Sequence, residues 1–166
     1  MTNIFKIAIV QENRDPYDSR EVALRFSKLH MDEGKKEIHQ ISGSISYCGL
    51  VCRQCHLADR CDGCLSENNC CGSRKSEEGC YQYNCCIVKG IEGCWECNIA
   101  PCDKGMFSES HDVRLRAFIK YIKENGKDKL AERLYSNMQK GIFYGHGKDY
   151  DNLGSIEVVL HKLEGQ

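Results

Sequence analysis

The first 45 residues carry two patterns of apolar and polar positions, and each pattern predicts a different element. The segment "NIFKIAIV" is rich in β-branched and apolar side chains, which is typical of a strand with at least one buried face. After the turn signal "RDPY", Asp18 or Ser19 is expected to cap a helix that runs to about Met31. Gly34 would end this helix, and the alternating segment "KEIHQIS" predicts a second strand.

Residues 107–166 show a helical pattern that is followed by a shorter apolar segment. The stretches "SESHDVRLRAFIKYIKENG" and "KDKLAERLYSNMQKG" each end at a glycine, Gly126 and Gly141, and each places apolar residues on one stripe. Two such helices joined at a glycine predict a helical hairpin. The tail "SIEVVLHKL" predicts a final strand, which would pair with the N-terminal strand. The apolar stripes comprise Leu115, Phe118, Ile119, Ile122, Leu130, Leu134 and Met138.

The middle of the chain, residues 46–106, has no apolar run that would form a core of its own. All thirteen cysteines fall within it, between Cys48 and Cys102. A segment of this length cannot stabilise itself by apolar burial alone, because small domains need covalent or metal staples. We therefore expect the thiols to supply the staple.

These patterns together predict an α+β protein that forms one compact domain. A small cysteine-rich metal-ribbon segment, residues 46–106, would lie between two flanking parts that provide the apolar packing. The N-terminal flank, residues 1–45, would be a strand–helix–strand segment. The C-terminal flank, residues 107–166, would be the helical hairpin and its strand.

The charge of the chain indicates neither nucleic acid nor membrane as a partner. Lys and Arg number 23 against 24 Asp and Glu, which leaves a net charge of −1. The apolar run near the N-terminus contains Lys6 and is not followed by a small-residue cleavage site, so it does not resemble a secretory signal. We expect a cytoplasmic protein. A protein partner would suit a binding or scaffold module, although the sequence identifies none.

The cysteine content changes this picture more than the charge does. Thirteen cysteines in 166 residues is a high density, at the edge of the roughly 8% that marks a cysteine-dependent scaffold. Thiols are kept reduced in the cytoplasm, so such a density favours metal binding over disulfides. The odd number agrees, because disulfides alone would leave one thiol over.

The spacing of the cysteines is typical of metal ligands. Two residues between paired cysteines let the backbone turn so that both sulfurs face one ion, and "CDGC" and "CWEC" are turns of this kind, with Gly63 easing the first. Two such turns form a tetrahedral zinc site with Zn–S bonds of about 2.3 Å. We expect two zinc ions and leave the roles of Cys70, Cys71 and Cys86 open, with His56 as an alternative ligand. The predicted ligands are Cys48, Cys52, Cys55, Cys61, Cys64, Cys80, Cys85, Cys94, Cys97 and Cys102.

An iron–sulfur cluster is the alternative that the cysteine pattern leaves open. Cys94, Cys97 and Cys102, with Cys85 or Cys86 upstream, would supply the four thiolates of a [4Fe–4S] cluster. The opening run "CGLVCRQC" also has the C-x3-C-x2-C spacing of radical S-adenosylmethionine enzymes. The aromatic residue usual before the last cysteine of that loop is absent, however, and no α/β barrel pattern follows. Dense paired cysteines fit zinc better than either iron–sulfur centre.

Catalysis is not indicated, and we expect no catalytic residues. Four-cysteine zinc sites are closed, whereas hydrolytic zinc needs an open position, and the H-E-x-x-H and deaminase signatures are absent. The glycine-rich "GIFYGHGKDYD" lacks the Ser or Thr of a phosphate loop after Lys148, so it predicts a flexible loop. Trp95 is expected to cover a metal site and exclude water, in preference to acting as an exposed recognition residue.

The pattern "YCGLVCRQC…CDGC…GIEGCWECNIAPCDKG" resembles the domain-of-unknown-function 3795 family of small cysteine-rich proteins. The likeness covers about residues 46–140, including the helical segment "RLRAFIKYIKENGKDKL". This chain departs from the pattern at Cys86, where alanine is expected, and at Glu77, where a cysteine often pairs with Cys80. The resemblance implies a zinc-binding module without an assigned activity.

Overall fold

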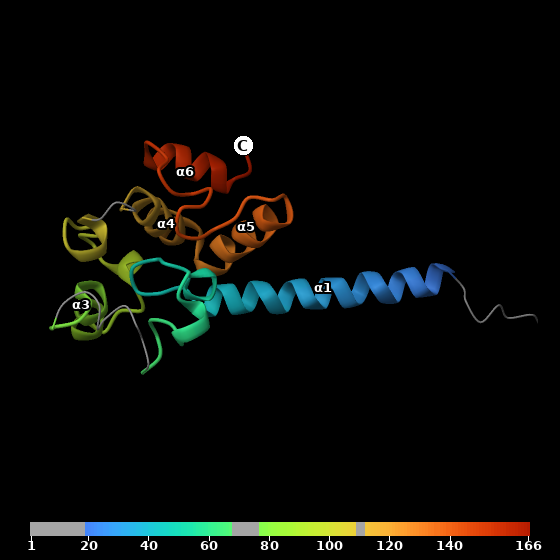
Figure 1. Ribbon diagram of the computed structural model, residues 1–166, viewed down its shortest axis with the longest axis horizontal. Helices are drawn as coiled ribbons and strands as arrows, with labels where there is room; N and C mark the ends of the chain where they lie inside the picture. The colour runs from blue at the N-terminus through green and yellow to red at the C-terminus, as the bar shows by residue number, and fades with distance from the viewer. Residues whose placement is uncertain (1–18, 68–76, 109–111) are drawn as a thin grey trace, which may run out of the picture. The chain divides into compact units, whose positions relative to one another are not determined.

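The computed structural model describes residues 19–67, 77–108 and 112–166 (Figure 1). Two units are distinguished along the chain, Met1–Glu33 and Gly34–Gln166. Helix α1 (Ser19–Gly43) begins in the first unit and ends in the second. The predicted strand "NIFKIAIV" lies outside the described residues.

The second predicted strand, "KEIHQIS", is wrong because these residues form the last two turns of α1. Ile38 and Ile41 stand at the three-residue spacing of a helix, and Ile41 is fully buried in the core. Gly34 does not end the helix either. It lies within α1, where a Cβ atom would approach the Tyr135 hydroxyl to 3.2 Å, so the absent side chain makes room for that ring.

The helical hairpin is confirmed. Helix α4 (Asp112–Asn125) and helix α5 (Lys127–Gln139) meet at Gly126, whose φ of 88° lies in the left-handed region that favours glycine. The predicted apolar stripes face the core, with every member buried except the partly exposed Met138. This pair of helices forms the centre of the second unit.

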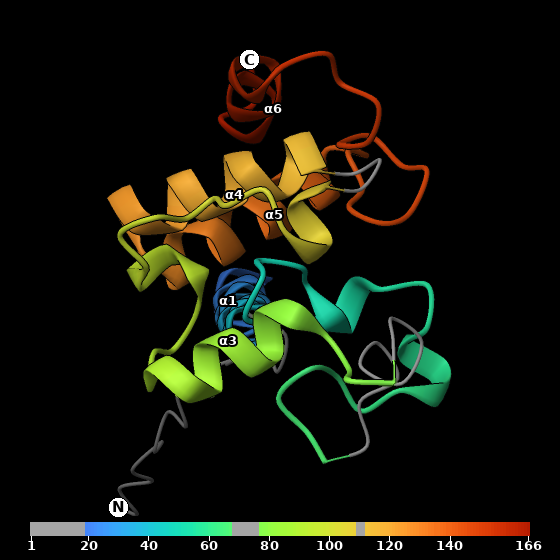
Figure 2. The same cartoon turned by 90° about the vertical axis from the view of Figure 1, so that its left-hand side faces the viewer.

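The predicted C-terminal strand is also wrong, since its residues form helix α6 (Ile156–Leu163). Val159 and Leu163 are four residues apart and buried, while Val158, directly before Val159, is half-exposed, which is the pattern of a helix and not of a strand. The Ser155 side chain accepts a hydrogen bond from the Val158 N–H at 3.4 Å and so caps the helix. Helix α6 packs against α4, and Figure 2 shows the two side by side.

The predicted α+β class is therefore corrected to an all-helical fold. Across residues 19–67, 77–108 and 112–166, β pairing is limited to one isolated antiparallel bridge between Ile45 and Val51. The cysteine-rich segment consists of helix α3 and short 3-10 turns. These elements are η1 (Cys52–Gln54), η2 (Ala58–Arg60), α3 (Tyr81–Lys89), η3 (Cys94–Glu96) and η4 (Gly105–Ser108).

The cysteine-rich segment shares the core of the hairpin instead of standing apart from it. Val51, Trp95 and Phe107 are buried in the same cluster as the apolar stripe of α4, and both η3 and η4 contact that helix. The buried Gln82 side chain ties α3 to η4 by donating to the Lys104 carbonyl at 2.6 Å and accepting from the Met106 N–H at 3.0 Å. Apolar packing and hydrogen bonds thus position the cysteine-rich segment in this structure.

The glycine-rich segment after α5 is held by a buried ion pair. Arg114 of α4 lies 2.7 Å from Asp151 and donates to the Gly145 carbonyl at 3.0 Å, and its guanidinium stacks over the Tyr144 ring. Asp151 also accepts a hydrogen bond from the Gly147 N–H. The Tyr144 hydroxyl in turn accepts from the Val51 N–H at 3.0 Å, which connects this segment to the cysteine-rich one.

In the described parts of the chain, no helix combines the length and apolar composition needed to cross a membrane.

Candidate metal sites

Eleven of the cysteines lie in the described residues, and none of these eleven forms a disulfide. Cys70 and Cys71 fall outside the described residues. Two thiol groups are distinguished by their neighbours. The first thiol group, whose members influence one another electrostatically, is defined as Cys48, Cys52, Cys55, Cys61, Cys64 and Cys80. The second thiol group, whose members line one cavity, is defined as Cys85, Cys86, Cys94, Cys97 and Cys102.

The members of the first thiol group are close enough to influence one another electrostatically. Burial raises the pKa of the Cys48 thiol to about 12, and Cys80 and Cys52 add smaller contributions of the same sign. Burial likewise raises the pKa of Cys64, with Cys48, Cys52 and Cys80 as its neighbouring thiols. Burial therefore favours the neutral form of the Cys48 and Cys64 thiols over the thiolate.

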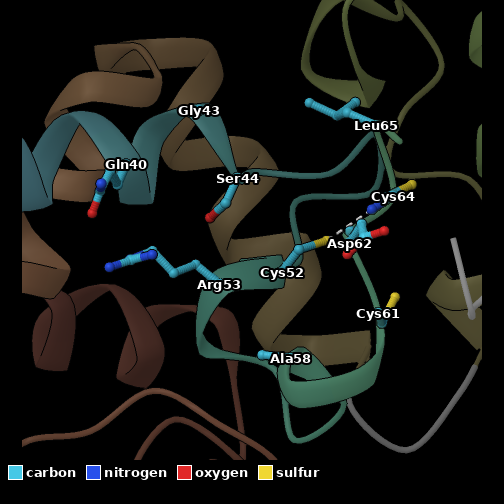
Figure 3. Close-up of a pocket in the computed structure, with 11 residues that line it drawn as sticks. Gln40, Gly43, Ser44, Cys52, Arg53, Ala58, Cys61, Asp62, Cys64 and Leu65 are labelled. Atoms are coloured by element: carbon cyan, nitrogen blue, oxygen red, sulfur yellow. Dashed lines mark hydrogen bonds between the residues drawn. The ribbon is translucent and has the colours of Figure 1, made fainter. Parts of the chain in front are cut away.

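A backbone-to-sulfur hydrogen bond joins the predicted turn "CDGC" to Cys52 of the opening run. The Cys64 N–H donates to the Cys52 sulfur at 3.3 Å (Figure 3). The Cys55 N–H donates to the Cys52 carbonyl at 3.1 Å. Gly63 has a φ of 95°, and a Cβ atom there would approach Cys52 Cβ to 3.2 Å. Glycine at this position therefore allows Cys61, Cys64 and Cys52 to come together.

An open pocket of about 450 Å³ adjoins the first thiol group. Cys52, Cys61 and Cys64 line it on one side, and Gln40 and Arg53 lie opposite them (Figure 3). The Arg53 guanidinium makes two 3.0 Å hydrogen bonds to the Glu37 carboxylate and is thereby held at the rim. Cys52, Cys61 and Cys64 thus border a space that solutes can enter, whereas Cys48 and Cys80 of the same group are buried.

The second thiol group encloses a much smaller space. All five of its cysteines line one cavity of about 20 Å³, which is close to the 10–15 Å³ that a single water molecule needs. The Cys86 and Cys94 sulfurs lie 3.8 Å apart. Two sulfurs bound to one tetrahedral zinc ion are also separated by about 3.8 Å when each Zn–S bond is about 2.3 Å.

Cys97 lies in a setting that favours its thiolate form. The N–H of Ile99 donates to this sulfur, and so does that of Ala100, and the Lys89 ammonium lies 3.2 Å away. The backbone hydrogen bond from Ile99 is the largest of the effects that lower the pKa of Cys97. Its turn, η3, therefore has the hydrogen-bond pattern that a thiolate ligand requires.

Cys86 is the member of this site that sequence reasoning left unassigned. It is 1% exposed and lies on α3, one turn after the buried Gln82, whereas its neighbour Cys85 is only partly buried. Adjacent residues on a helix point about 100° apart, so the two thiols cannot aim at the same ion equally well. The four-residue spacing from Gln82 to Cys86 could have indicated that both side chains lie on the same face of a helix. That interpretation requires knowing that residues 81–89 are helical.

His56 and Trp95 are two further residues for which the sequence predicts a role beside a metal site. His56 is exposed, its Nδ1 lies 3.9 Å from the Cys55 sulfur, and its ring contacts that of His146. Trp95 is 7% exposed and therefore is not an exposed recognition residue. A Cβ atom at Gly93 would come within 2.3 Å of the Trp95 ring, so the indole fills the space beside that glycine.

The sulfurs are gathered but are not arranged as complete coordination shells. Within the described residues, no three Cys, His, Asp or Glu side chains lie where they could jointly hold a metal ion. The Cys86 and Cys94 sulfurs, 3.8 Å apart, form a pair and not a group of three.

Comparisons with models of known protein families, with curated proteins and with solved structures found no match. The resemblance to the domain-of-unknown-function 3795 family therefore stays a prediction. A functional assignment has to rest on the arrangement of the thiols.

Proposed function

We propose that this chain is a zinc-binding protein in which cysteine thiolates hold two structural zinc ions within a binding or scaffold module. The proposal requires reduced thiols, as expected for a cytoplasmic protein, and none of the eleven described cysteines is in a disulfide. Zinc would stabilise the cysteine-rich segment by tying together turns that are far apart in sequence.

The observation that carries the proposal is the second thiol group. Cys86 and Cys94 stand at the separation of two ligands on one zinc ion, beside a cavity that three further thiols line. We assign Cys97 and Cys102 as the other two ligands, since Cys85 diverges from Cys86 around the helix. Four sulfurs leave zinc no open position, so the ion would be structural and not catalytic.

The size of the cavity favours zinc over an iron–sulfur cluster. A [4Fe–4S] unit brings eight inorganic atoms and takes four cysteine ligands. The space between the five thiols has a volume of about 20 Å³, which suits one atom or ion. A cluster would need the surrounding turns to move apart.

The first thiol group would hold the second ion. Cys52, Cys61 and Cys64 are assigned as three of its ligands, with another sulfur of the same group completing the shell. Cation binding would release protons from thiols whose pKa values burial has raised, Cys64 among them. The positive charge of the ion replaces the proton as the partner of each sulfur.

Elemental analysis and an absorbance spectrum of protein purified without oxygen test the proposal. We expect a colourless protein with close to two zinc ions per chain, and close to one in the Cys86→Ser variant. Val88→Ser is the matched control, because Val88 lies on the same helix and is 87% exposed. A folded protein without metal, or a brown protein that contains iron and sulfide, would contradict the proposal.

A further inference from the structure

The side of helix α3 that faces away from the core carries apolar side chains. Gln82 and Cys86 lie on the core side and are buried, whereas Tyr81 and Val88 are exposed, Val88 at 87%. Tyr81, Cys85 and Val88 follow one another at four- and three-residue spacing, which places them on one stripe of the helix. We call these three residues the outer stripe. It is apolar although it is not part of the core.

A groove of about 330 Å³ adjoins the outer stripe and is lined by residues from Glu78 to Lys89. Ile99, in the loop after η3, widens the apolar surface, because it lines the 20 Å³ cavity together with Tyr81 and Cys85 and is itself 71% exposed. Contiguous exposed apolar surface indicates an interaction site, whereas single exposed apolar side chains do not.

The charged groups at the two ends of the groove have opposite signs. Glu78 lies where α3 begins, and Lys89 is the last residue of the helix. An ammonium has three N–H donors, so the contact of Lys89 with the Cys97 sulfur leaves donors for a carboxylate. Lys104, a further cation beside the stripe, lies over the Tyr81 ring, which is a favourable place for a cation.

We propose that this face of α3 is the interface of a homodimer, in which a second copy of the chain packs its own outer stripe antiparallel against the first. Both copies use the same surface in a two-fold symmetric interface, so that surface must be complementary to itself. Reversal of one helix brings Tyr81 of one copy against Val88 of the other. It also brings Glu78 of one copy towards Lys89 of the other, and the two-fold axis repeats both pairings.

The order of charges along the groove favours a second copy over a partner of one charge sign. A partner with acidic residues beside its apolar ones would suit Lys89 but would set a carboxylate against Glu78. A basic partner would have the opposite mismatch. The reversed copy places an opposite charge at each end, and like charges facing each other across an interface are what specific association avoids.

Sedimentation velocity of the full-length chain, in reducing buffer over a range of concentrations, tests the inference. We expect a monomer–dimer equilibrium, and Val88→Asp should raise its dissociation constant roughly tenfold or more, because the new carboxylate would be buried against an apolar surface. Ile87→Asp is the matched control. Ile87 is 54% exposed and does not line the groove, and as the neighbour of Val88 on the helix it points about 100° away.

The control variant should therefore dimerise like the unaltered chain. A chain that stays monomeric at about 1 mM, or an equal loss of dimer in Val88→Asp and Ile87→Asp, would overturn the inference. The measured quantity is the mass of the particle and not its metal content. A monomeric chain with two zinc ions would thus overturn the homodimer and leave the proposed function intact.

Exchange of the two end charges tests the antiparallel arrangement with variants that keep the apolar stripe. Glu78→Lys sets a lysine against Lys89 at both ends of the interface and should weaken association. The double variant Glu78→Lys/Lys89→Glu restores opposite charges and should recover the dimer. Circular dichroism shows whether each variant keeps its helices. An undiminished dimer in a folded Glu78→Lys variant, or no recovery in a folded double variant, would overturn the inference.

Discussion

At the scale of single residues, Cys97 and Cys48 show two opposite effects of the fold on a cysteine thiol. Backbone N–H groups and the Lys89 ammonium favour the thiolate of Cys97 and lower its pKa. Cys48 is buried, its pKa is raised to about 12, and the Ser46 hydroxyl lies 3.2 Å from its sulfur. Cys97 thus favours its thiolate more than an ordinary cysteine does, whereas burial favours the neutral thiol of Cys48.

Lys89 gives a prediction at this scale, because its ammonium lies 3.2 Å from the Cys97 sulfur. We expect Lys89→Met to weaken zinc binding roughly tenfold, as the loss of an outer partner of a ligand commonly does. Competition with a coloured chelator measures the change. Lys89→Arg is the matched control, since it keeps the positive charge and should bind zinc nearly as well as the unaltered chain. Equal affinity in all three proteins would contradict the prediction.

At the scale of elements, the sequence predicts the long helices well and the short apolar segments poorly. Helices α4 and α5 carry long periodic stripes between glycines, and both were predicted close to their observed ends. The segments "KEIHQIS" and "SIEVVLHKL" are too short for their apolar spacing to separate a strand from a helix. Their helical state follows from packing: Ile41 and Leu163 are both buried. The sequence pattern did not predict helix α3. For that reason the sequence alone does not indicate whether Cys86 is a metal ligand.

The Arg114–Asp151 ion pair gives a prediction for the glycine-rich segment after α5. The two side chains are 5% and 9% exposed, so Arg114→Met would leave a buried carboxylate without its partner. We expect the free energy of unfolding to fall by about 3–5 kcal/mol in urea denaturation.

Two further variants separate this effect from a general loss of charge. The double variant Arg114→Met/Asp151→Leu should recover most of the lost stability, because it removes the unpaired carboxylate. Arg53→Met breaks the more exposed pair with Glu37, whose side chains are 43% and 31% exposed, and it should cost less than about 1 kcal/mol. Similar losses from Arg114→Met and Arg53→Met would show that burial of the first pair has no special role.

At the scale of the whole molecule, residues 34–166 combine an apolar helical core with a cysteine-rich segment packed onto it. The sequence alone predicts that this segment needs covalent or metal cross-links, and the cysteine spacing predicts ten of its cysteines as metal ligands. Spacing could not show that the thiols divide into an open and an enclosed group, because that division depends on how α3, η1 and η3 fold back on one another. The shared core also means that α4, α5 and α6 have apolar contacts of their own, with Leu115, Phe118 and Leu130 fully buried.

The most direct test of the central claim is amide hydrogen exchange of the full chain before and after zinc is removed with a strong chelator under reducing conditions. If zinc staples the cysteine-rich segment, removal should abolish protection in α3 and around η3, while α4 and α5 stay largely protected by their apolar core. Addition of zinc should restore the lost protection. Unchanged protection of α3 and η3 in a chain shown to be free of metal would contradict the account.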